Sequence, residues 1–287
     1  MTNEIDPDYL RDLVKRALME DCGNAGDITS RAIFDNGQLG SAIIESKEDG
    51  ILSGSYILEP IFNYLDPSIT LDKMINDGNK LHQGAIICRL RGSLLGILAG
   101  ERVALNFLQH LSGIATATHS LAFAIAHTKT RLLDTRKTTP TLRLLEKRAV
   151  LDGGGGNHRF GLFDMILIKD THVKAAGGVA PAIEKARVAA AQLKKSVKIE
   201  AEVQTWEEFL DALRLVPDRI MLDNMSLELM SACVRRARQE APGVELEASG
   251  NINARNIALT AETGVDFVSS GAITHSVKAM DIHLVVE

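Results

Sequence analysis

Short apolar runs alternate with amphipathic helical stretches through the second half of the chain. The runs begin at Arg131 and read RLLD, MILIKD, KIEAEV, RIMLD, VELEAS and VDFVSS. Apolar strands separated by helices predict parallel strands joined by crossover helices. Six such units, rather than eight, predict an incomplete or distorted β/α barrel. The helical stretches that separate them are 142–151, 181–194, 206–215, 227–240 and 254–262.

The N-terminal part of the chain has a different pattern. Asp6 and Pro7 stand before a stretch whose apolar residues fall on one helical face, which predicts a helix that ends by Gly23. Short β-like runs follow at 41–45 and 85–91, with glycine-containing turns around them. This mixture of short strands and helix predicts a small α+β domain.

Two apolar helical stretches, 94–111 and 114–127, lie between these patterns. We expect an N-terminal α+β sandwich domain over residues 1–113 and a C-terminal open β/α barrel over residues 114–275, so the fold class is α/β. The tail, residues 276–287, follows the sixth strand, and we expect it to return to the first domain.

Composition restricts the class of protein. Hydrophobic residues make up 45% and charged residues 24% of the 287 positions, as in globular domains. The formal net charge of −5 argues against nucleic-acid and membrane partners, so any basic site must be local. Three well-separated cysteines favour reduced thiols over a disulfide framework. The acidic start lacks the features of a signal peptide, and we expect a cytoplasmic location.

Polar residues stand at the end of each of the six apolar runs. The carboxyl ends of parallel strands meet at one edge of a sheet, where α/β barrels assemble their active sites. We therefore expect a catalytic pocket at this edge. The residues that end the runs are Asp134, Lys169, Asp170, Glu202, Asp223, Ser249 and Ser270.

Basic residues are concentrated between positions 134 and 174, although the protein is acidic overall. Arg136 and Lys137 directly follow a strand end, which favours a binding role. The basic residues of the predicted helix that follows are interpreted as solvated surface charges. They are Arg143, Lys147 and Arg148.

Four consecutive glycines, 153–156, precede Asn157, His158 and Arg159. A glycine run is costly to order, so it indicates either a flexible loop that ends a helix or backbone that passes close to a ligand. Arg159 can hold a carboxylate in a bidentate pair, and a second cation is available at Arg136. We therefore favour the ligand-binding interpretation.

Lys169 ends an apolar strand. A structural lysine there would extend its charged end to solvent, whereas a buried lysine is normally paired or catalytic, and we favour the buried, functional interpretation. Glu202 and Asp223 end the next two strands, and Glu200 lies two residues earlier on the same strand face as Glu202. Such carboxylates can hold Mg²⁺ with bound waters, bind sugar hydroxyls or stabilise developing positive charge. Structural salt bridges are the alternative.

Two loops rich in small residues follow the last two strands. They contain Ser249, Gly250 and Asn251 in ASGNI, and Ser270 and Gly271 in SSGAITHS. Backbone N–H groups and serine hydroxyls in such loops can cradle a phosphate. His82, His110, His119 and His127 show no metal-ligand spacing, so no structural zinc is expected.

Together these parts suit two substrates, a polycarboxylate and a phosphorylated sugar. Glycosyl transfer from an activated ribose passes through a cationic, oxocarbenium-like centre, which carboxylates stabilise while Mg²⁺ and lysine neutralise a departing diphosphate. An aldolase-like barrel in which Lys169 forms a Schiff base is an alternative from a different mechanistic class.

Several long motifs match a known family. They are DTRKTTP, GGGGNHRFGLFDMILIKD, IEAEV, IMLDNM, LEASGNI and SSGAITHS, with KEDGILSG and ERVALNFLQHLSGIAT earlier in the chain. On these motifs the sequence resembles the quinolinate phosphoribosyltransferases. The resemblance implies an enzyme of NAD synthesis that joins quinolinate to phosphoribosyl pyrophosphate, with Mg²⁺ as cofactor. It releases nicotinate mononucleotide, diphosphate and CO₂.

The resemblance also implies roles for single residues on the side of the pocket that binds quinolinate. Arg102 enters the site from the neighbouring subunit of a homodimer or higher even oligomer, which explains a cation within an apolar stretch. The residues that line the quinolinate site within one subunit are Thr135, Arg136, Lys137, His158, Arg159 and Lys169.

On the sugar-phosphate side, the resemblance places Glu202 and Asp223 beside the ribose and the Mg²⁺-diphosphate, and both glycine loops beside the phosphate. The catalytic residues that it implies are Lys137, Lys169, Glu202 and Asp223.

The chain departs from the family pattern at Thr141, Thr171 and Ala201, where glycine, asparagine and a larger residue are usual. None of these changes removes a charge, and they leave the loop geometry open. Two alternatives share the fold. One is a molybdenum-transport-associated relative, which typically lacks the lysine matched by Lys169, and the other is a non-catalytic anion-binding relative.

Overall fold

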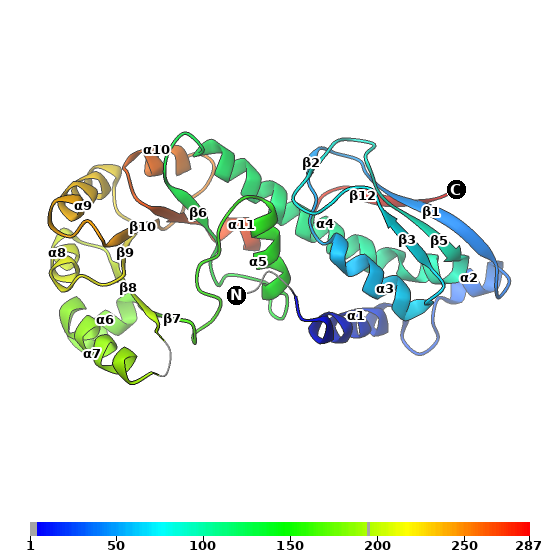
Figure 1. The fold of residues 1–287 in the computed structure, drawn as a ribbon, viewed down its shortest axis with the longest axis horizontal. Coiled ribbons are helices and arrows are strands. Elements are labelled where there is room, and N and C mark those ends of the chain that lie inside the picture. Colours follow the sequence, from blue (N-terminus) through cyan, green and yellow to red (C-terminus); the bar gives the residue numbers. More distant parts are fainter. Residues whose placement is uncertain (1–4, 194–195) are drawn as a thin grey trace. The chain divides into compact units, whose positions relative to one another are not determined.

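The computed structural model describes residues 5–193 and 196–287 (Figure 1). Residues 1–4 of the expected first domain and Lys194, the expected end of a helix, lie outside these residues. The chain forms two compact units. The first contains the residues up to His119 together with Leu144–Gly154 and Val277–Glu287, and the second contains Ser120–Arg143 and Gly155–Ser276.

An antiparallel sheet is the centre of the first unit, with the strand order β12-β1-β5-β3. The predicted strands at 41–45 and 85–91 correspond to β1 and β5, which pair with Ala42 opposite Leu90. The C-terminal strand β12 pairs with the other edge of β1. The strands of this unit are β1 (Leu39–Ser46), β2 (Gly50–Ile51), β3 (Thr70–Lys73), β4 (Lys80–Leu81), β5 (Ile86–Ser93) and β12 (Ile282–Val286).

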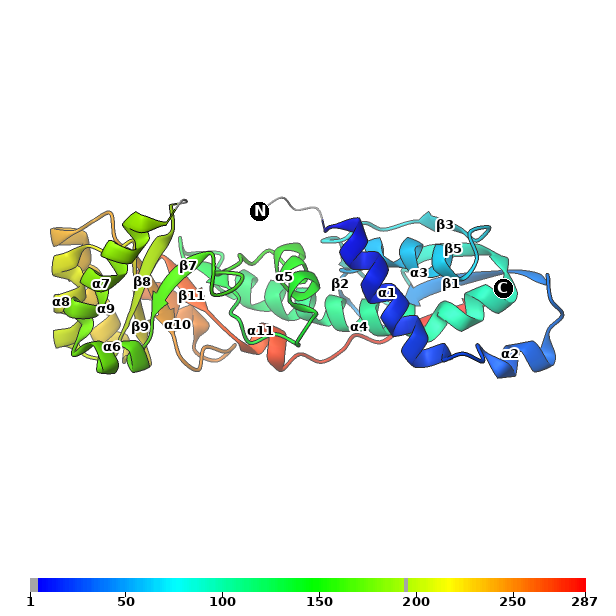
Figure 2. The ribbon, with the colours of Figure 1, turned by 90° about the horizontal axis from the view of Figure 1, so that it is seen from below.

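Short helices accompany this sheet. The N-terminal helix α1 begins and ends as predicted, because the Asp6 carboxylate accepts the Asp8 N–H at 2.9 Å and Gly23 follows the last turn. Its buried face packs on α3, and the two helices lie side by side in Figures 1 and 2. The helices are α1 (Pro7–Cys22), α2 (Ile28–Ile33), the 3-10 turn η1 (Ser55–Ile57), α3 (Leu58–Leu65) and α5 (Arg143–Asp152), of which Arg143 belongs to the second unit.

Helix α4 (Leu94–Ala124) is one continuous helix, so the expected division into two stretches is wrong. Gly113 does not end it. A Cβ at Gly113 would lie 2.3 Å from the backbone oxygen of Lys278. A glycine is needed here because the C-terminal segment passes close to the helix. The expected boundary at residue 113 therefore falls inside this helix, whose last residues belong to the second unit.

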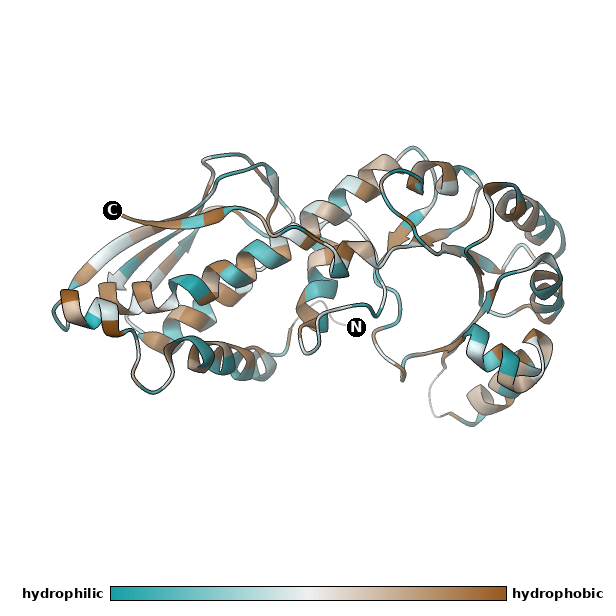
Figure 3. Cartoon of the chain, turned by 180° about the vertical axis from the view of Figure 1, so that it is seen from behind, coloured by the Kyte–Doolittle hydropathy of each residue, from teal (hydrophilic) through white to brown (hydrophobic). Residues whose placement is uncertain are grey.

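The second unit is an open β/α barrel, as the six apolar runs predict (Figure 3). Its six parallel strands have the order β6-β11-β10-β9-β8-β7, so β6 and β7 are the edges of the sheet. A single bridge between Leu133 and Gly156 continues from β6 beyond that order. The strands are β6 (Arg131–Leu133), β7 (Met165–Ile168), β8 (Lys198–Val203), β9 (Arg219–Asp223), β10 (Glu245–Ser249) and β11 (Phe267–Ser269).

Crossover helices cover the outer face of this curved sheet (Figure 3). Two of them, α8 and α9, have the predicted bounds, whereas α10 begins three residues later than expected and the short α6 and α11 were not predicted. These helices are α6 (Asp170–Ala176), α7 (Val179–Gln192), α8 (Trp206–Leu215), α9 (Leu227–Glu240), α10 (Ile257–Glu262) and α11 (Ala272–His275). In the part of the chain that the structure describes, no helix combines the length and the apolar character needed to cross a bilayer.

Candidate active site

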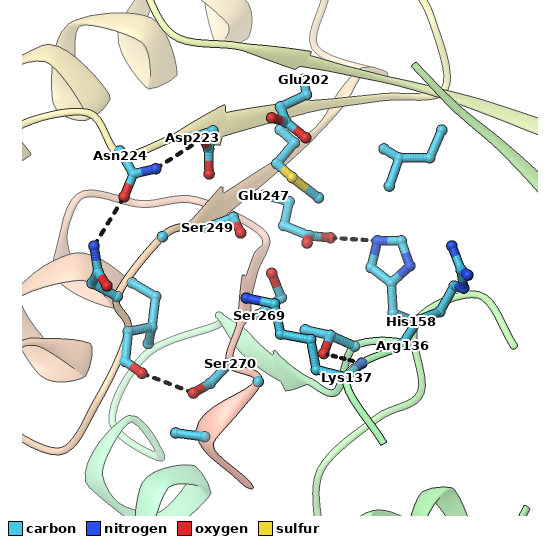
Figure 4. A pocket seen from close by; sticks show the side chains of 18 of the residues that line it. Arg136, Lys137, His158, Glu202, Asp223, Asn224, Glu247, Ser249, Ser269 and Ser270 are labelled. Carbon is cyan, nitrogen blue, oxygen red and sulfur yellow. Dashed lines mark hydrogen bonds and ion pairs between the residues drawn. The ribbon is translucent and has the colours of Figure 1, made fainter. Parts of the chain in front are cut away.

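A pocket of about 750 Å³ opens at the carboxyl ends of the barrel strands (Figure 4). Thr135 and Lys169 come from the loops that follow β6 and β7, and Glu202 and Asp223 come from the ends of β8 and β9. Every barrel residue that the family resemblance assigns to the site contributes to the lining, whereas the strand-end residues Asp134 and Asp170 do not. The other assigned residues are Arg136, Lys137, His158, Arg159, Ser249, Gly250, Asn251, Ser270 and Gly271.

Asp134 joins the two loops that bring the cations to the pocket. Its fully buried carboxylate accepts the backbone N–H of His158 at 2.8 Å and the side-chain amide of Asn157 at 2.7 Å. The backbone strengthens this junction, because the Asp134 N–H donates to the Gly156 carbonyl at 3.1 Å. The strand-end carboxylate predicted from the sequence is therefore a clamp between two loops, and it does not line the pocket.

Beneath the pocket, the barrel interior contains a layer of buried charge. His158 Nε2 lies 3.0 Å from Glu200 Oε2 and 3.4 Å from Glu247 Oε2, and both carboxylates are fully buried. Arg219 Nη1 pairs with Glu247 at 2.8 Å, and Arg219 Nη2 pairs with Glu245 at 3.0 Å. Figure 4 shows the contact between Glu247 and His158.

This layer fixes the orientation of the His158 ring. Burial alone lowers the pKa of His158, but hydrogen bonds to Glu200 and Glu247 and their charges outweigh it and raise the pKa to about 9. The Arg159 N–H lies 2.7 Å from Nδ1 and favours a ring without a proton there. In either form, Nε2 lies within ion-pair distance of the two carboxylates.

The same layer is the one group of potential metal ligands found among the described residues. The ligand atoms of His158, Glu200 and Glu247 lie within 4.8 Å of one another. The Arg219 guanidinium already neutralises Glu247, and burial with the Glu247 charge raises the pKa of Glu200. An ion-pair network therefore accounts for the cluster without a metal.

Lys169 and Glu202 form an ion pair across neighbouring strand ends. Lys169 Nζ lies 3.6 Å from Glu202 Oε2. The lysine is half exposed, so its pairing, rather than the expected burial, accounts for its place at the end of an apolar strand. Burial raises the pKa of Glu202, and the positive charge of the neighbouring Lys169 opposes this increase. A substrate that enters here meets both signs of charge.

Lys137 lies directly against the last loop of the barrel. A Cβ at Gly271 would lie 2.8 Å from Lys137 Cδ, so the lysine stem occupies the space that a side chain would need. The Thr274 hydroxyl donates to the Lys137 carbonyl at 2.7 Å. The Ser270 hydroxyl donates to the Ile252 carbonyl at 2.8 Å, so this serine holds the two glycine loops together.

Amide side chains connect the end of β9 to the loop after β10. Asn224 Nδ2 donates to Asp223 Oδ2 at 2.9 Å, and Asn224 Oδ1 accepts from Asn251 Nδ2 at 3.2 Å (Figure 4). Gly250 has a φ of +99°, and a Cβ there would lie 2.2 Å from Asn224 Oδ1. The glycine of this loop is therefore required by packing against Asn224 as well as by backbone conformation.

Several lining residues were not predicted from the sequence. Asn224, Glu247 and His275 all contribute to the pocket. Glu247 could have been found, because it is an acidic residue inside an apolar strand and lies two residues before Ser249, on the same strand face. Asn224 directly follows a predicted strand end. His275 has no comparable signal, since a turn of α11 brings it to the pocket.

The four-glycine run has a structural explanation. A Cβ at Gly153 would lie 2.4 Å from the Ala115 carbonyl oxygen, and Gly154 has a φ of +85°. Gly156 packs against the Leu133 side chain. None of the four lines the described pocket, and packing and backbone conformation account for Gly153, Gly154 and Gly156 without a ligand.

The basic helix after the Arg136 loop is not a solvated face. Lys147 and Glu146 are buried, and Glu146 pairs with His110 at 2.8 Å. Arg148 pairs with Asp152 at 2.9 Å. Arg143 is partly buried and donates to three oxygens of the barrel unit. The expectation of surface charges fails because Lys147 is buried and because Arg143 and Arg148 hold partners within the protein.

Two expected features lie outside the pocket. Arg102 is exposed on α4 in the first unit and does not contribute to the described lining. Thr141, where the family resemblance implied a glycine, has a φ of +71°. That conformation is unfavourable for a β-branched residue by about 1–2 kcal/mol, which explains the preference for glycine.

Comparison with known proteins identifies the chain. The model of the N-terminal domain of quinolinate phosphoribosyl transferase matches residues 27–112, and the model of its C-terminal domain matches residues 114–285. The chain belongs to the quinolinate phosphoribosyltransferase family. The resemblance inferred from the sequence motifs is thus confirmed.

Individual members of the quinolinate phosphoribosyltransferase family are similar over nearly all of this chain. A mitochondrial quinolinate phosphoribosyltransferase [decarboxylating] of Nicotiana tabacum is 42% identical, over 98% of this chain and 83% of its own. A probable nicotinate-nucleotide pyrophosphorylase of Bacillus subtilis is 41% identical, over 96% and 92%. The solved structure of the nicotinate-nucleotide pyrophosphorylase from Francisella tularensis has a TM-score of 0.93 at 41% identity, over 99% and 98% of the two chains.

In this member of the family, the buried charge layer predicts unequal roles for the two acidic partners of Arg219. Glu247→Gln should lower the free energy of unfolding by about 3 kcal/mol, because it leaves buried cations without a full countercharge. Glu245→Gln, at the partly exposed partner, should cost about 1 kcal/mol or less. Chemical denaturation of both variants measures the difference, and equal losses would contradict the importance of the buried layer.

Proposed function

We propose that this chain transfers phosphoribose from phosphoribosyl pyrophosphate to quinolinate. The products are nicotinate mononucleotide, diphosphate and CO₂, so the enzyme is a decarboxylating pentosyltransferase of de novo NAD synthesis. The observation that supports this most directly is the division of one pocket into two sides. Cations of the β6 and β7 loops form one side, and carboxylates with two glycine loops form the other.

The cationic side suits a planar dicarboxylate. Arg136, Arg159 and His158 line it, with Lys137 and Lys169 at its borders with the acidic side. Arg159 Nη1 is held by the Met165 carbonyl at 3.2 Å, which leaves further donors of the guanidinium for a carboxylate. Burial, and then the charge of Arg136, lowers the pKa of Arg159. An incoming carboxylate relieves this repulsion, which favours an acidic substrate.

On the acidic side, we propose that Glu202 and Asp223 stabilise the positive charge that develops on the ribose when the bond to diphosphate breaks. Lys169 pairs with Glu202 and can also face the departing oxygens. The loops that contain Ser249, Gly250 and Gly271 suit the 5′-phosphate, because at the two glycines no side chain separates the backbone from the pocket.

The decarboxylation follows from the new bond. Attachment of the ribose carbon to the pyridine nitrogen makes that nitrogen positively charged. When the adjacent carboxylate leaves as CO₂, the electron pair stays on the ring carbon, is stabilised by the charged nitrogen and then takes up a proton. Cations that hold the second carboxylate keep the ring oriented during this step.

We propose Mg²⁺ as the metal ion of this reaction. The oxygen donors of Glu202 and Asp223 at the acidic side are of the type that Mg²⁺ prefers, together with substrate phosphates and water. When bound, the ion neutralises charge on the diphosphate. Removal of divalent ions by a chelator should abolish turnover, and addition of Mg²⁺ should restore it.

The assembly and the location belong to the same proposal. Arg102 lies in the first unit and does not line the described pocket, which suits a role in the site of a second copy in a homodimer or higher even oligomer. We also propose a cytoplasmic location for this chain, although the names of plant relatives place them in mitochondria or chloroplasts.

The proposed activity is tested with purified protein, Mg²⁺ and phosphoribosyl pyrophosphate. Quinolinate labelled in its carboxylates should release CO₂ with equimolar formation of nicotinate mononucleotide, whereas nicotinate should give no product. Binding of quinolinate without product under any metal condition would instead favour a non-catalytic relative, and product from nicotinate would contradict the proposed specificity.

Arg159→Ala should weaken quinolinate binding about a hundredfold or more and leave binding of phosphoribosyl pyrophosphate nearly unchanged, because it removes one charged partner of a carboxylate. Calorimetry with each ligand alone measures both affinities. Similar losses of affinity for the two ligands would refute the assignment of Arg159 to the cationic, quinolinate-binding side of the pocket.

Arg102→Ala should be inactive by itself and should regain activity when mixed with inactive Lys169→Ala protein. A shared site explains this, because one of the two sites in a hybrid dimer receives both intact residues. Activity of re-assembled mixtures measures the effect. No recovery in mixtures that demonstrably contain hybrids would argue against a contribution across the interface.

A further inference from the structure

Arg143 is a cation that the proposed reaction does not use. It is the first residue of α5 and does not line the pocket. Its guanidinium donates through three different nitrogens: Nε to Thr138 Oγ1 at 2.9 Å, Nη1 to the Phe160 carbonyl at 3.0 Å, and Nη2 to the Arg136 carbonyl at 3.3 Å. Its Cζ also lies 6.0 Å from the centre of the Phe160 ring.

These acceptors belong to the two loops that carry the basic residues of the cationic side of the pocket. Arg136 and Thr138 follow β6, whereas Phe160 directly follows Arg159 in the segment before β7. The two strands are the edges of the sheet, and among the described residues a single backbone bridge, between Leu133 and Gly156, joins the two loops at their base. Asp134 joins the loops at their base, and Arg143 joins them at the positions that carry the arginines.

The chemistry of arginine suits this position. A planar guanidinium holds several acceptors in a fixed mutual geometry, which the single rotating ammonium of lysine cannot do. The three acceptors are neutral oxygens, so its positive charge adds to the attraction of this side of the pocket for an anion.

We propose that Arg143 is a positioning residue, which sets the spacing of the Arg136 and Arg159 side chains by holding the backbone at Arg136 and Phe160 together. The inference rests on the proposed binding of quinolinate to the cationic side of the pocket. It concerns the affinity for the dicarboxylate alone, because the glycine loops and the acidic strand ends have no contact with Arg143 through these bonds.

The test compares Arg143→Lys and Arg143→Ala with Arg238→Lys. Arg238 is a matched control, since its guanidinium also donates to a backbone carbonyl of the barrel unit, that of Val244 at 3.2 Å, away from the pocket lining. Both Arg143 variants should raise the Kd and the KM for quinolinate by about tenfold to a hundredfold, with those for phosphoribosyl pyrophosphate unchanged. Arg238→Lys should leave both substrates unaffected.

Guanidinium ion should restore quinolinate affinity to Arg143→Ala at concentrations below those that denature the protein, and methylammonium should not. If the Arg143 variants do not fold, Thr138→Val removes one acceptor at constant shape and should raise the Kd for quinolinate selectively by a smaller factor. Equal losses for both substrates, or a lower Tm with unchanged quinolinate affinity, would overturn the proposal. An inactive wild-type enzyme that binds no quinolinate would overturn the proposed function instead.

Discussion

Because β6 and β7 are the two edges of the barrel sheet, the loops that carry the cations of the pocket cannot rely on a strand ladder to hold them together. A single backbone bridge between Leu133 and Gly156 joins the loops at their base, and side chains add to it. The buried Asp134 carboxylate accepts hydrogen bonds from the His158 backbone and from Asn157, and the Arg143 guanidinium joins Arg136 and Phe160 farther out. A pocket for a dicarboxylate therefore depends on a few hydrogen bonds across an open seam.

The charge layer beneath the pocket gives this seam a rigid neighbour. His158 lies between the loop that contains Arg159 and the carboxylates of Glu200 and Glu247, which lie on β8 and β10. Arg219 balances the acidic charge from β9. Since unpaired buried charges are strongly unfavourable, the four side chains can satisfy one another in few arrangements, and the imidazole orientation follows from that restriction.

The barrel was predictable from the sequence because its six strands are mostly apolar and each has a polar residue at or near its end. The pocket could be predicted for the same reason, since strand ends of a parallel sheet share an edge. The role of Lys147 and Glu146 could not, because their burial depends on long-range contacts such as that between Glu146 and His110. Single-sequence periodicity contains no such information.

The glycines show a second limit. The sequence around Gly113, Gly153 and Gly271 does not show what each glycine contacts, namely the Lys278 carbonyl, the Ala115 carbonyl and the Lys137 stem. A close approach between distant segments leaves no local pattern.

The buried charge layer beneath the pocket has a consequence for the effect of temperature on the protein. Hydration of ions becomes less favourable as temperature rises, so the penalty for burying these four groups falls on warming, and the ion pairs in the floor of the pocket become less costly to maintain.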